Sequence, residues 1–247
     1  MTTTALAPAP MFPGQADAPT GPCDLTGMYL MHHGFRRDLT RLAAAARRTP
    51  HDDAATWKAL AGWWRDVAAL LHEHHTKEDE LLWPVLLDRV DDEGRAVLEA
   101  MEDEHHLIDP LLVAVEQGLG DLAAAGVLAT TGARDRTAAA LTELRDVVDA
   151  HLAHEERDAV AVIQRHLSAE EWQQLERDGL AAKPPPPLLF FLLPWIAEGL
   201  QPGDLAPLLE QAGGPIRVLL RLTRGRYQRR AEKAFAHLAD AGTGSAA

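Results

Sequence analysis

The chain has 247 residues, which is enough to bury a sizeable core in one domain that carries an appendage. Its formal net charge of −13 argues against nucleic-acid binding. Its single cysteine excludes an intramolecular disulfide and fits a reducing compartment. Alanine, leucine and charged residues dominate, and no stretch keeps an alternating apolar pattern, so an all-α fold is predicted.

The first 22 residues are rich in Pro, Ala and Thr and contain no Lys or Arg, so the basic region of a secretory signal is missing. We expect a disordered tail over residues 1–22 and a cytoplasmic protein. The longest apolar run, Leu188 to Ala197, is shorter than the ~20 residues that span a bilayer. No integral membrane segment is therefore expected.

Four long amphipathic helices are predicted between residues 23 and 167, and we expect them to form a four-helix bundle. Their expected ranges are 24–48, 53–83, 92–119 and 133–167. The second is expected to end or kink at Pro84, and Gly118, Gly120 and Gly126 are expected to separate the third helix from the fourth.

Residues 168–247 predict a C-terminal helical extension. Ser168 and Glu171 are spaced as a capping box for a fifth helix, and Pro184 to Pro187 predict a stiff linker. Further helices are expected at about 188–199, 204–212 and 215–238. Seven basic residues and one acidic residue fall between Arg217 and Lys233. Contact with the acidic bundle, or a solvated face, is the favoured explanation; a docking surface for an acidic partner or membrane is the alternative.

Four histidines lie on the apolar stripes of the four predicted bundle helices. They are His32, His74, His105 and His151. Glu78 and Glu155 each follow a histidine by four residues, which places both side chains of each pair on one helix face. The pattern repeats, because a lone histidine precedes one pair by 42 residues and the other by 46. Two such half-sites facing each other in a bundle predict a dinuclear metal centre.

The register of these pairs needs a check, because histidine is abundant here. Two further pairs have the same spacing, His75/Asp79 and His154/Asp158. On the helices of His32, His105 and His151, the residues three and four positions away are apolar, which favours these three histidines as the inward ones. The choice between His74 and His75 stays open, since Leu82 and Leu86 give His75 a partly apolar face as well.

The ligand types favour iron. A single buried histidine is usually a hydrogen-bonded core residue, but four histidines and two glutamates facing inward are costly unless a cation compensates them. Mixed imidazole and carboxylate ligands suit two iron ions with an oxo or hydroxo bridge; manganese is the second choice, and structural zinc generally uses cysteine. The positive charge left on such a centre would stabilise bound peroxide, azide or nitric-oxide-derived species.

Four pieces of the sequence resemble the hemerythrin-like (HHE cation-binding) domain over residues 24–167. They are Met28–His32 with Phe35-Arg36-Arg37, His74–Pro84, Met101–His105 and His151–Glu156. The resemblance implies an all-α, up-and-down four-helix bundle. The implied metal ligands are His32, His74, Glu78, His105, His151 and Glu155. The style of the whole chain resembles hemerythrin-domain proteins of actinobacteria.

One departure from the family pattern concerns Met101. Oxygen-carrying hemerythrins have a further histidine at this place, one turn before the position of His105. A thioether is a poor ligand for oxidised iron, so two coordination positions are expected to stay open where the oxygen carriers leave one. Glu104, His75 or His154 are alternatives that would fill the gap. An open centre favours reactivity or sensing over reversible transport.

Three classes of function follow from these patterns. The first is a non-haem di-iron protein that binds O2 or related small ligands, peroxide or nitric oxide, for sensing or redox protection. The second is a weak di-iron peroxidase or catalase-like enzyme. The third is a metal-free helical interaction protein. The sequence favours the first and identifies no protein partner.

Overall fold

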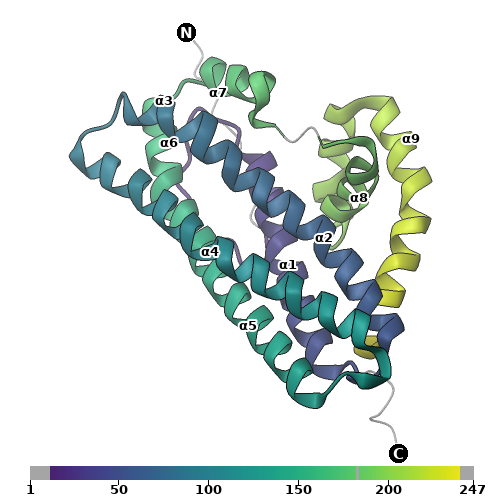
Figure 1. The fold of residues 1–247 in the computed structure, drawn as a ribbon. Helices are drawn as coiled ribbons and strands as arrows, with labels where there is room; N and C mark the ends of the chain where they lie inside the picture. Colours follow the sequence, from purple (N-terminus) through teal and green to yellow (C-terminus); the bar gives the residue numbers. More distant parts are fainter. Residues whose placement is uncertain (1–11, 182–183, 240–247) are drawn as a thin grey trace, which may run out of the picture.

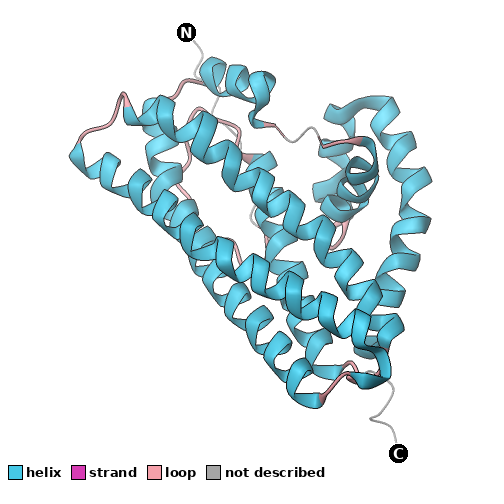
Figure 2. Ribbon diagram, viewed as in Figure 1, coloured by secondary structure: helices cyan, strands magenta, loops and turns pink. Residues whose placement is uncertain are grey.

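The computed structural model describes residues 12–181 and 184–239, and within these ranges the regular structure is helical, with no strand (Figures 1 and 2). The bundle elements are α1 (Thr26–Arg48), α2 (Ala54–Lys77), η1 (Glu78–Leu82), α3 (Trp83–Leu87), α4 (Asp92–Ala125), η2 (Gly126–Leu128), α5 (Thr131–His154), η3 (Glu155–Ala159) and α6 (Val160–His166). The later elements are α7 (Ala169–Leu175), η4 (Glu176–Leu180), α8 (Pro186–Ala197), α9 (Pro202–Ala234) and α10 (Ala236–Ala239).

Four continuous helical stretches form the bundle: α1, α2 with η1 and α3, α4, and α5 with η3 and α6 (Figure 1). α1 packs against α2 and α5, and α4 packs against the same two helices. Short connections make consecutive stretches antiparallel. The predicted all-α fold, an up-and-down four-helix bundle with an additional C-terminal helical segment, is confirmed.

Local capping explains where the bundle helices begin. The side chains of Asp53, Asp91 and Thr130 each accept a hydrogen bond from a backbone N–H in the first turn of α2, α4 and α5 respectively. α4 continues through Gly118 to Ala125, beyond its predicted end at 119, because an interior glycine weakens a helix by only about 1 kcal/mol. A Cβ on Gly118 would lie 2.6 Å from Thr137 Oγ1, so this glycine lets α4 and α5 approach closely.

Two hydrophobic clusters fill the bundle, one on each side of the predicted metal ligands. On α1, Tyr29 belongs to one cluster and Phe35 to the other, with His32 between them. On α4, Met101 and Ile108 flank His105 in the same way. The ligands therefore form a polar layer between two apolar layers, as the inward stripes predict.

The C-terminal helices share the bundle core. α8 packs on α1, and α9 runs beside α2 (Figure 1). Phe191, Trp195 and Phe235 lie in the same apolar cluster as the three tryptophans of α2. A Cβ on Gly34 would lie 2.3 Å from the Trp195 ring, so α8 can approach α1 this closely only because residue 34 is glycine.

A buried carboxylate links this extension to the bundle. Asp38 is fully buried on α1. Its Oδ2 accepts hydrogen bonds from the indole N–H groups of Trp63 on α2 (2.6 Å) and Trp195 on α8 (2.9 Å). Its Oδ1 accepts from Arg37 Nε at 2.8 Å, and Arg37 Nη1 also donates to the backbone carbonyls of Trp195 and Glu198.

The N-terminal segment, expected as a disordered tail, contacts the bundle over its described part. Phe12 is buried in the apolar cluster around Tyr29. The backbone N–H of Ala16 donates to Glu156 Oε2 at 2.7 Å. Residues 12–22 of the expected tail therefore contact the bundle at these two points, while residues 1–11 lie outside the described part of the chain.

The basic segment lies in α9. The two helices expected at 204–212 and 215–238 form one element with a break at Gly213, where φ is 81°. Arg230 forms an ion pair with Asp66 of α2, and most other basic side chains between 217 and 233 are exposed. One cation of the segment therefore contacts the acidic bundle, and the exposed ones are compatible with both a solvated face and a docking surface.

Among the described helices, one stretch, Asp92–Leu128, is long and apolar enough to cross a membrane by length and composition alone. Of its most apolar segment of 18 residues, 22% is buried, and the stretch supplies His105 to the bundle. A single stretch of this kind is weak evidence for a membrane segment.

The predicted capping box of α7 is present and gives a stability test. Ser168 Oγ accepts from the Glu171 backbone N–H (3.2 Å), and the Ser168 N–H donates to Glu171 Oε2 (2.9 Å). Ser168→Ala is expected to lower the free energy of unfolding by about 1 kcal/mol, measured by urea denaturation. Ser168→Asp keeps a capping acceptor and serves as the control. Equal loss in both variants would contradict a capping role.

Candidate metal centre

The six predicted site residues lie together in the polar layer of the bundle, and His75 joins them. One group consists of His32, His74, Glu78 and Glu155, and the other of His75, His105 and His151. Within each group the potential ligand atoms lie within 4.8 Å of one another. The arrangement therefore offers five imidazoles and two carboxylates from four helical stretches.

A π-helical turn begins at each of the two glutamates. η1 starts at Glu78 and η3 starts at Glu155. The backbone N–H of Trp83 donates to the Glu78 carbonyl, and that of Val160 donates to the Glu155 carbonyl; each bond spans five residues and widens the helix locally. Such π-turns are rare and occur frequently at functional sites. Pro84, which lacks an N–H, lies in the first turn of α3, and the helical stretch continues to Leu87 instead of ending there as expected.

His75 corrects the sequence interpretation, which treated His74 and His75 as alternatives. Both rings reach the site, but in different groups: His74 lies beside His32, and His75 stacks on His105 with ring centroids 4.1 Å apart. Met101, in the place of a further family histidine, is fully buried in the apolar cluster instead. His75 thus brings a fifth imidazole into the layer, and it is one of the alternatives considered for the place of Met101.

Glu78 joins the two groups. Its Oε1 lies 3.2 Å from His74 Nε2, and its Oε2 lies 3.7 Å from His105 Nε2. A carboxylate with one oxygen towards each group has the position of a bridging ligand. Glu155 approaches the first group from the opposite stretch, with Oε2 at 3.2 Å from His32 Nε2.

The hydrogen bonding of these atoms fits a cation. All four carboxylate oxygens of Glu78 and Glu155 and the Nε2 of His75 are buried without a hydrogen-bond partner. Such atoms cost several kcal/mol in a protein interior unless something compensates them. A metal ion is the partner that accepts lone pairs from carboxylate oxygens and imidazole nitrogens together.

Outer carboxylates fix the orientation of three histidines. The Nδ1–H of His32 donates to Glu156 (2.9 Å), that of His105 to Asp79 (2.8 Å) and that of His151 to Glu104 (2.8 Å). When these rings are neutral with Nδ1 protonated, each Nε2 carries a lone pair. The Nε2 atoms of His105 and His151 then present lone pairs to each other at 3.2 Å, and the Nε2 atoms of His32 and His74 lie 3.1 Å apart. Facing lone pairs repel unless a cation lies between them, and carboxylate–histidine–metal contacts are common at metal sites.

These outer residues are functional positions that the apolar stripes do not reveal. Glu104, considered as a gap-filling ligand, instead also accepts from His154 Nδ1 at 2.8 Å. His154 is therefore an outer residue as well. The spacing of Asp79 after His75 is visible in the sequence, but the contact of Asp79 with His105 on another helix is not.

Protonation in this layer shows how the buried groups conflict. Burial, together with the neighbouring Glu155, holds the pKa of Glu78 well above its usual range. Burial and nearby histidines lower the pKa of His75 well below its usual range. At His32 burial lowers the pKa, but Glu155 and Glu156 outweigh it and raise the pKa to about 9. A metal requires ionised glutamates and neutral histidines, so its binding would displace the protons that Glu78 and His32 otherwise retain.

Fold and site together define a helical bundle with a buried group of residues that could hold metal. The family model of the hemerythrin HHE cation binding domain matches residues 24–171, and the chain belongs to this family. The family and the His/Glu groups support cation binding. Searches of curated proteins and of solved structures found no match.

The role of His75 can be tested directly. His75→Ala removes one imidazole from the three-histidine group and is expected to weaken binding of one metal ion at least about tenfold, as loss of a supporting contact already does. Metal content after dialysis against graded chelator measures this. The matched control is His106→Ala on α4, because His106 is exposed. Unchanged metal retention in His75→Ala would exclude it as a ligand.

Proposed function

We propose that the protein is a non-haem di-iron protein that binds O2 or related small ligands, such as peroxide and nitric oxide, for sensing or redox protection. The observation that carries this proposal is the pair of buried ligand groups joined by Glu78. Five imidazoles and two carboxylates suit iron, with manganese as the second choice.

The assignment of residues follows from the two groups. His32 and His74 would hold one ion, and His75, His105 and His151 the other, with Glu78 and Glu155 bridging. An oxo or hydroxo bridge would complete the pair. When bound, such an iron pair exchanges electrons with small oxygen- or nitrogen-containing ligands.

The unequal number of imidazoles supports one open position. On this assignment His75, His105 and His151 would give one ion three imidazoles and His32 and His74 would give the other two, so the ion of His32 and His74 would keep a position for an added ligand. Phe35 lies against the His74 ring, with centroids 5.6 Å apart, and provides an apolar neighbour for the first group. A less polar surrounding strengthens the electrostatic attraction of an anionic ligand.

A weak peroxidase or catalase-like activity is the second candidate, because a pocket from the surface reaches His74 and Glu78. The third class, a metal-free interaction protein, is disfavoured by the buried carboxylate oxygens without partners. Peroxide turnover separates the first two candidates, and metal analysis separates both from the third.

The test is metal analysis and absorption spectroscopy of the purified protein. Close to two iron ions per chain and near-ultraviolet charge-transfer absorption are expected. Added azide should perturb the spectrum, because it takes the open position. A protein that binds no iron under reducing, iron-replete conditions would contradict the proposal, and iron binding without any response to azide, peroxide or nitric oxide would contradict the open position.

A further inference from the structure

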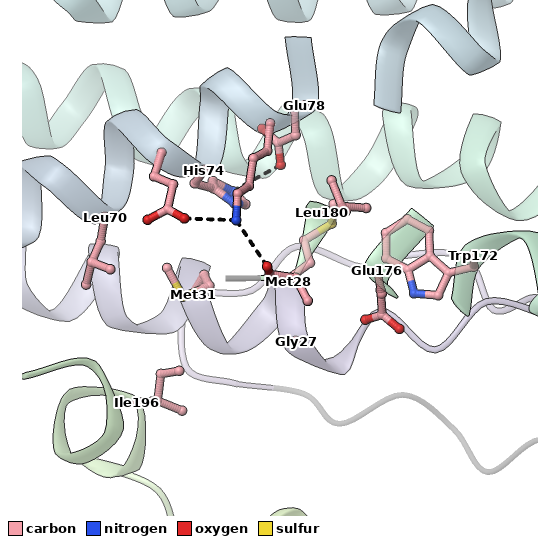
Figure 3. Close-up of a pocket in the computed structure, with 13 residues that line it drawn as sticks. Gly27, Met28, Met31, Leu70, His74, Glu78, Trp172, Glu176, Leu180 and Ile196 are labelled. Carbon is pink, nitrogen blue, oxygen red and sulfur yellow. Dashed lines mark hydrogen bonds and ion pairs between the residues drawn. The ribbon is translucent and has the colours of Figure 1, made fainter. Parts of the chain in front are cut away.

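A pocket of about 250 Å³ lies beside the first ligand group, on the side of His74 and Glu78 (Figure 3). Its opposite wall is the start of α1, with Gly27, Met28 and Met31 (Figure 3). The C-terminal segment closes it further with Trp172, Leu180 and Ile196. The pocket thus lies next to the proposed open coordination position, between the bundle helices α1 and α2 and the C-terminal segment.

The size of this pocket exceeds what a diatomic ligand needs. One water molecule takes about 30 Å³ in the liquid, so O2, nitric oxide or hydrogen peroxide would take on the order of 30–60 Å³. The pocket is several times larger. It is somewhat smaller than the sites that hold drug-sized molecules, which start at roughly 300 Å³. Its volume therefore suits a small organic molecule.

The lining separates apolar from polar contacts. Methionine, leucine, isoleucine and tryptophan side chains form the apolar part of the wall, which suits a hydrocarbon body, and Glu73, Glu78 and Glu176 also line the pocket. The polar groups next to the ligand pair include Lys77, whose ammonium donates to Glu73 Oε1 at 2.9 Å and to the Ala181 carbonyl at 3.0 Å. An ammonium has three N–H donors, so one is left for a ligand oxygen.

We propose that this pocket binds an organic hydroperoxide, with its peroxide group towards His74 and Lys77 and its hydrocarbon body between Met28, Met31 and Ile196. This inference rests on the proposed function, because the peroxide group is then presented to the open position. Hydrogen peroxide lacks the hydrocarbon body, so it gains nothing from the apolar wall, whereas burying each CH₂ group adds about 0.8 kcal/mol.

Selectivity for such a ligand would come from the C-terminal extension. Trp172, Leu180 and Ile196 all lie beyond residue 171, where the match to the family ends. The same bundle without this segment would leave the space beside His74 open on that side. The extension therefore acts as the wall that selects an organic body.

The test uses 2-phenyl-2-propanol, the unreactive alcohol that corresponds to cumene hydroperoxide. Its binding to the full chain is measured by isothermal titration calorimetry, with and without iron. The pocket-filling variant is Gly27→Leu, because a Cβ at this helical glycine meets nothing within 4 Å and the added side chain has room. The matched control is Gly120→Leu, an exposed helical glycine on α4 whose added Cβ also meets nothing within 4 Å.

The wild type and Gly120→Leu are expected to bind the alcohol equally, and Gly27→Leu at least tenfold more weakly. Iron content and melting temperature of each sample separate loss of the pocket from loss of the metal centre or the fold. Binding to the iron-free protein would support the pocket even if the iron proposal failed. Iron and azide binding without measurable alcohol binding, or equal binding in Gly27→Leu, would overturn the pocket proposal and leave the proposed function intact.

Discussion

Replacing Glu78 and Glu155 together with alanine is expected to abolish dinuclear iron binding and to lower the melting temperature to that of the iron-free protein. Free metal at a thousandfold excess over its Kd stabilises the folded state by about 4 kcal/mol. For a chain of this size that corresponds to a shift on the order of 10 °C. Iron analysis and differential scanning calorimetry measure the two effects, and chelation of the wild type should give the same shift.

The matched control is the double variant Glu99→Ala, Glu102→Ala, which removes two exposed carboxylates from α4. It should keep full iron loading. Glu78→Gln adds a second comparison, since it keeps the shape of the side chain and removes its charge. Because the Glu78 oxygens have no hydrogen-bond partner, iron-free Glu78→Gln should be at least as stable as the iron-free wild type. Full iron retention in the alanine double variant would show that these carboxylates do not bind the metal.

Asp38→Ala is expected to destabilise the protein by about 3–5 kcal/mol, the usual cost of leaving one partner of a buried charged pair alone. The change removes the acceptor shared by the indoles of Trp63 and Trp195 and the partner of Arg37. Asp38→Asn keeps an acceptor for the indoles and should lose less. Chemical denaturation of the iron-loaded proteins measures both values.

Asp149→Ala is the control for that experiment. Asp149 also accepts from an α1 arginine, Arg36, but its side chain is 61% exposed, so its pairing should contribute about 0–1 kcal/mol. If Asp38→Ala cost no more than Asp149→Ala, the carboxylate on α1 would not be what joins α8 to the bundle.

The periodicity of apolar residues was enough to predict the four bundle helices, because each has one face in the core. It also placed His32, His105 and His151 on inward faces, where the structure has them. It could not place His74 and His75 together, since residues adjacent in an α-helix point about 100° apart. The π-turn at Glu78 changes the helical repeat locally, and nothing in the apolar pattern encodes that change.

Contacts between distant segments were beyond the reach of the pattern for a different reason. Glu104 accepts a hydrogen bond from His151, and Asp79 accepts one from His105. Both bonds depend on the relative position of two helices along their axes, to within one residue. The packing of Phe12 on the bundle is likewise a tertiary contact, and the Pro- and Ala-rich composition of its segment does not predict it. Local propensity favoured disorder there, and burial outweighed it.

The close packing of Trp195 on Gly34 indicates that the folded unit extends beyond the part of the chain that matches the family. The family match ends at residue 171, yet the indole that packs against Gly34 belongs to residue 195. A chain cut at the family boundary would leave a groove along α1, with the Asp38 carboxylate at its floor facing solvent. The smallest stable unit is therefore expected to be longer than the matched domain. Residues 24–171 alone should be less stable than the full chain and prone to aggregation.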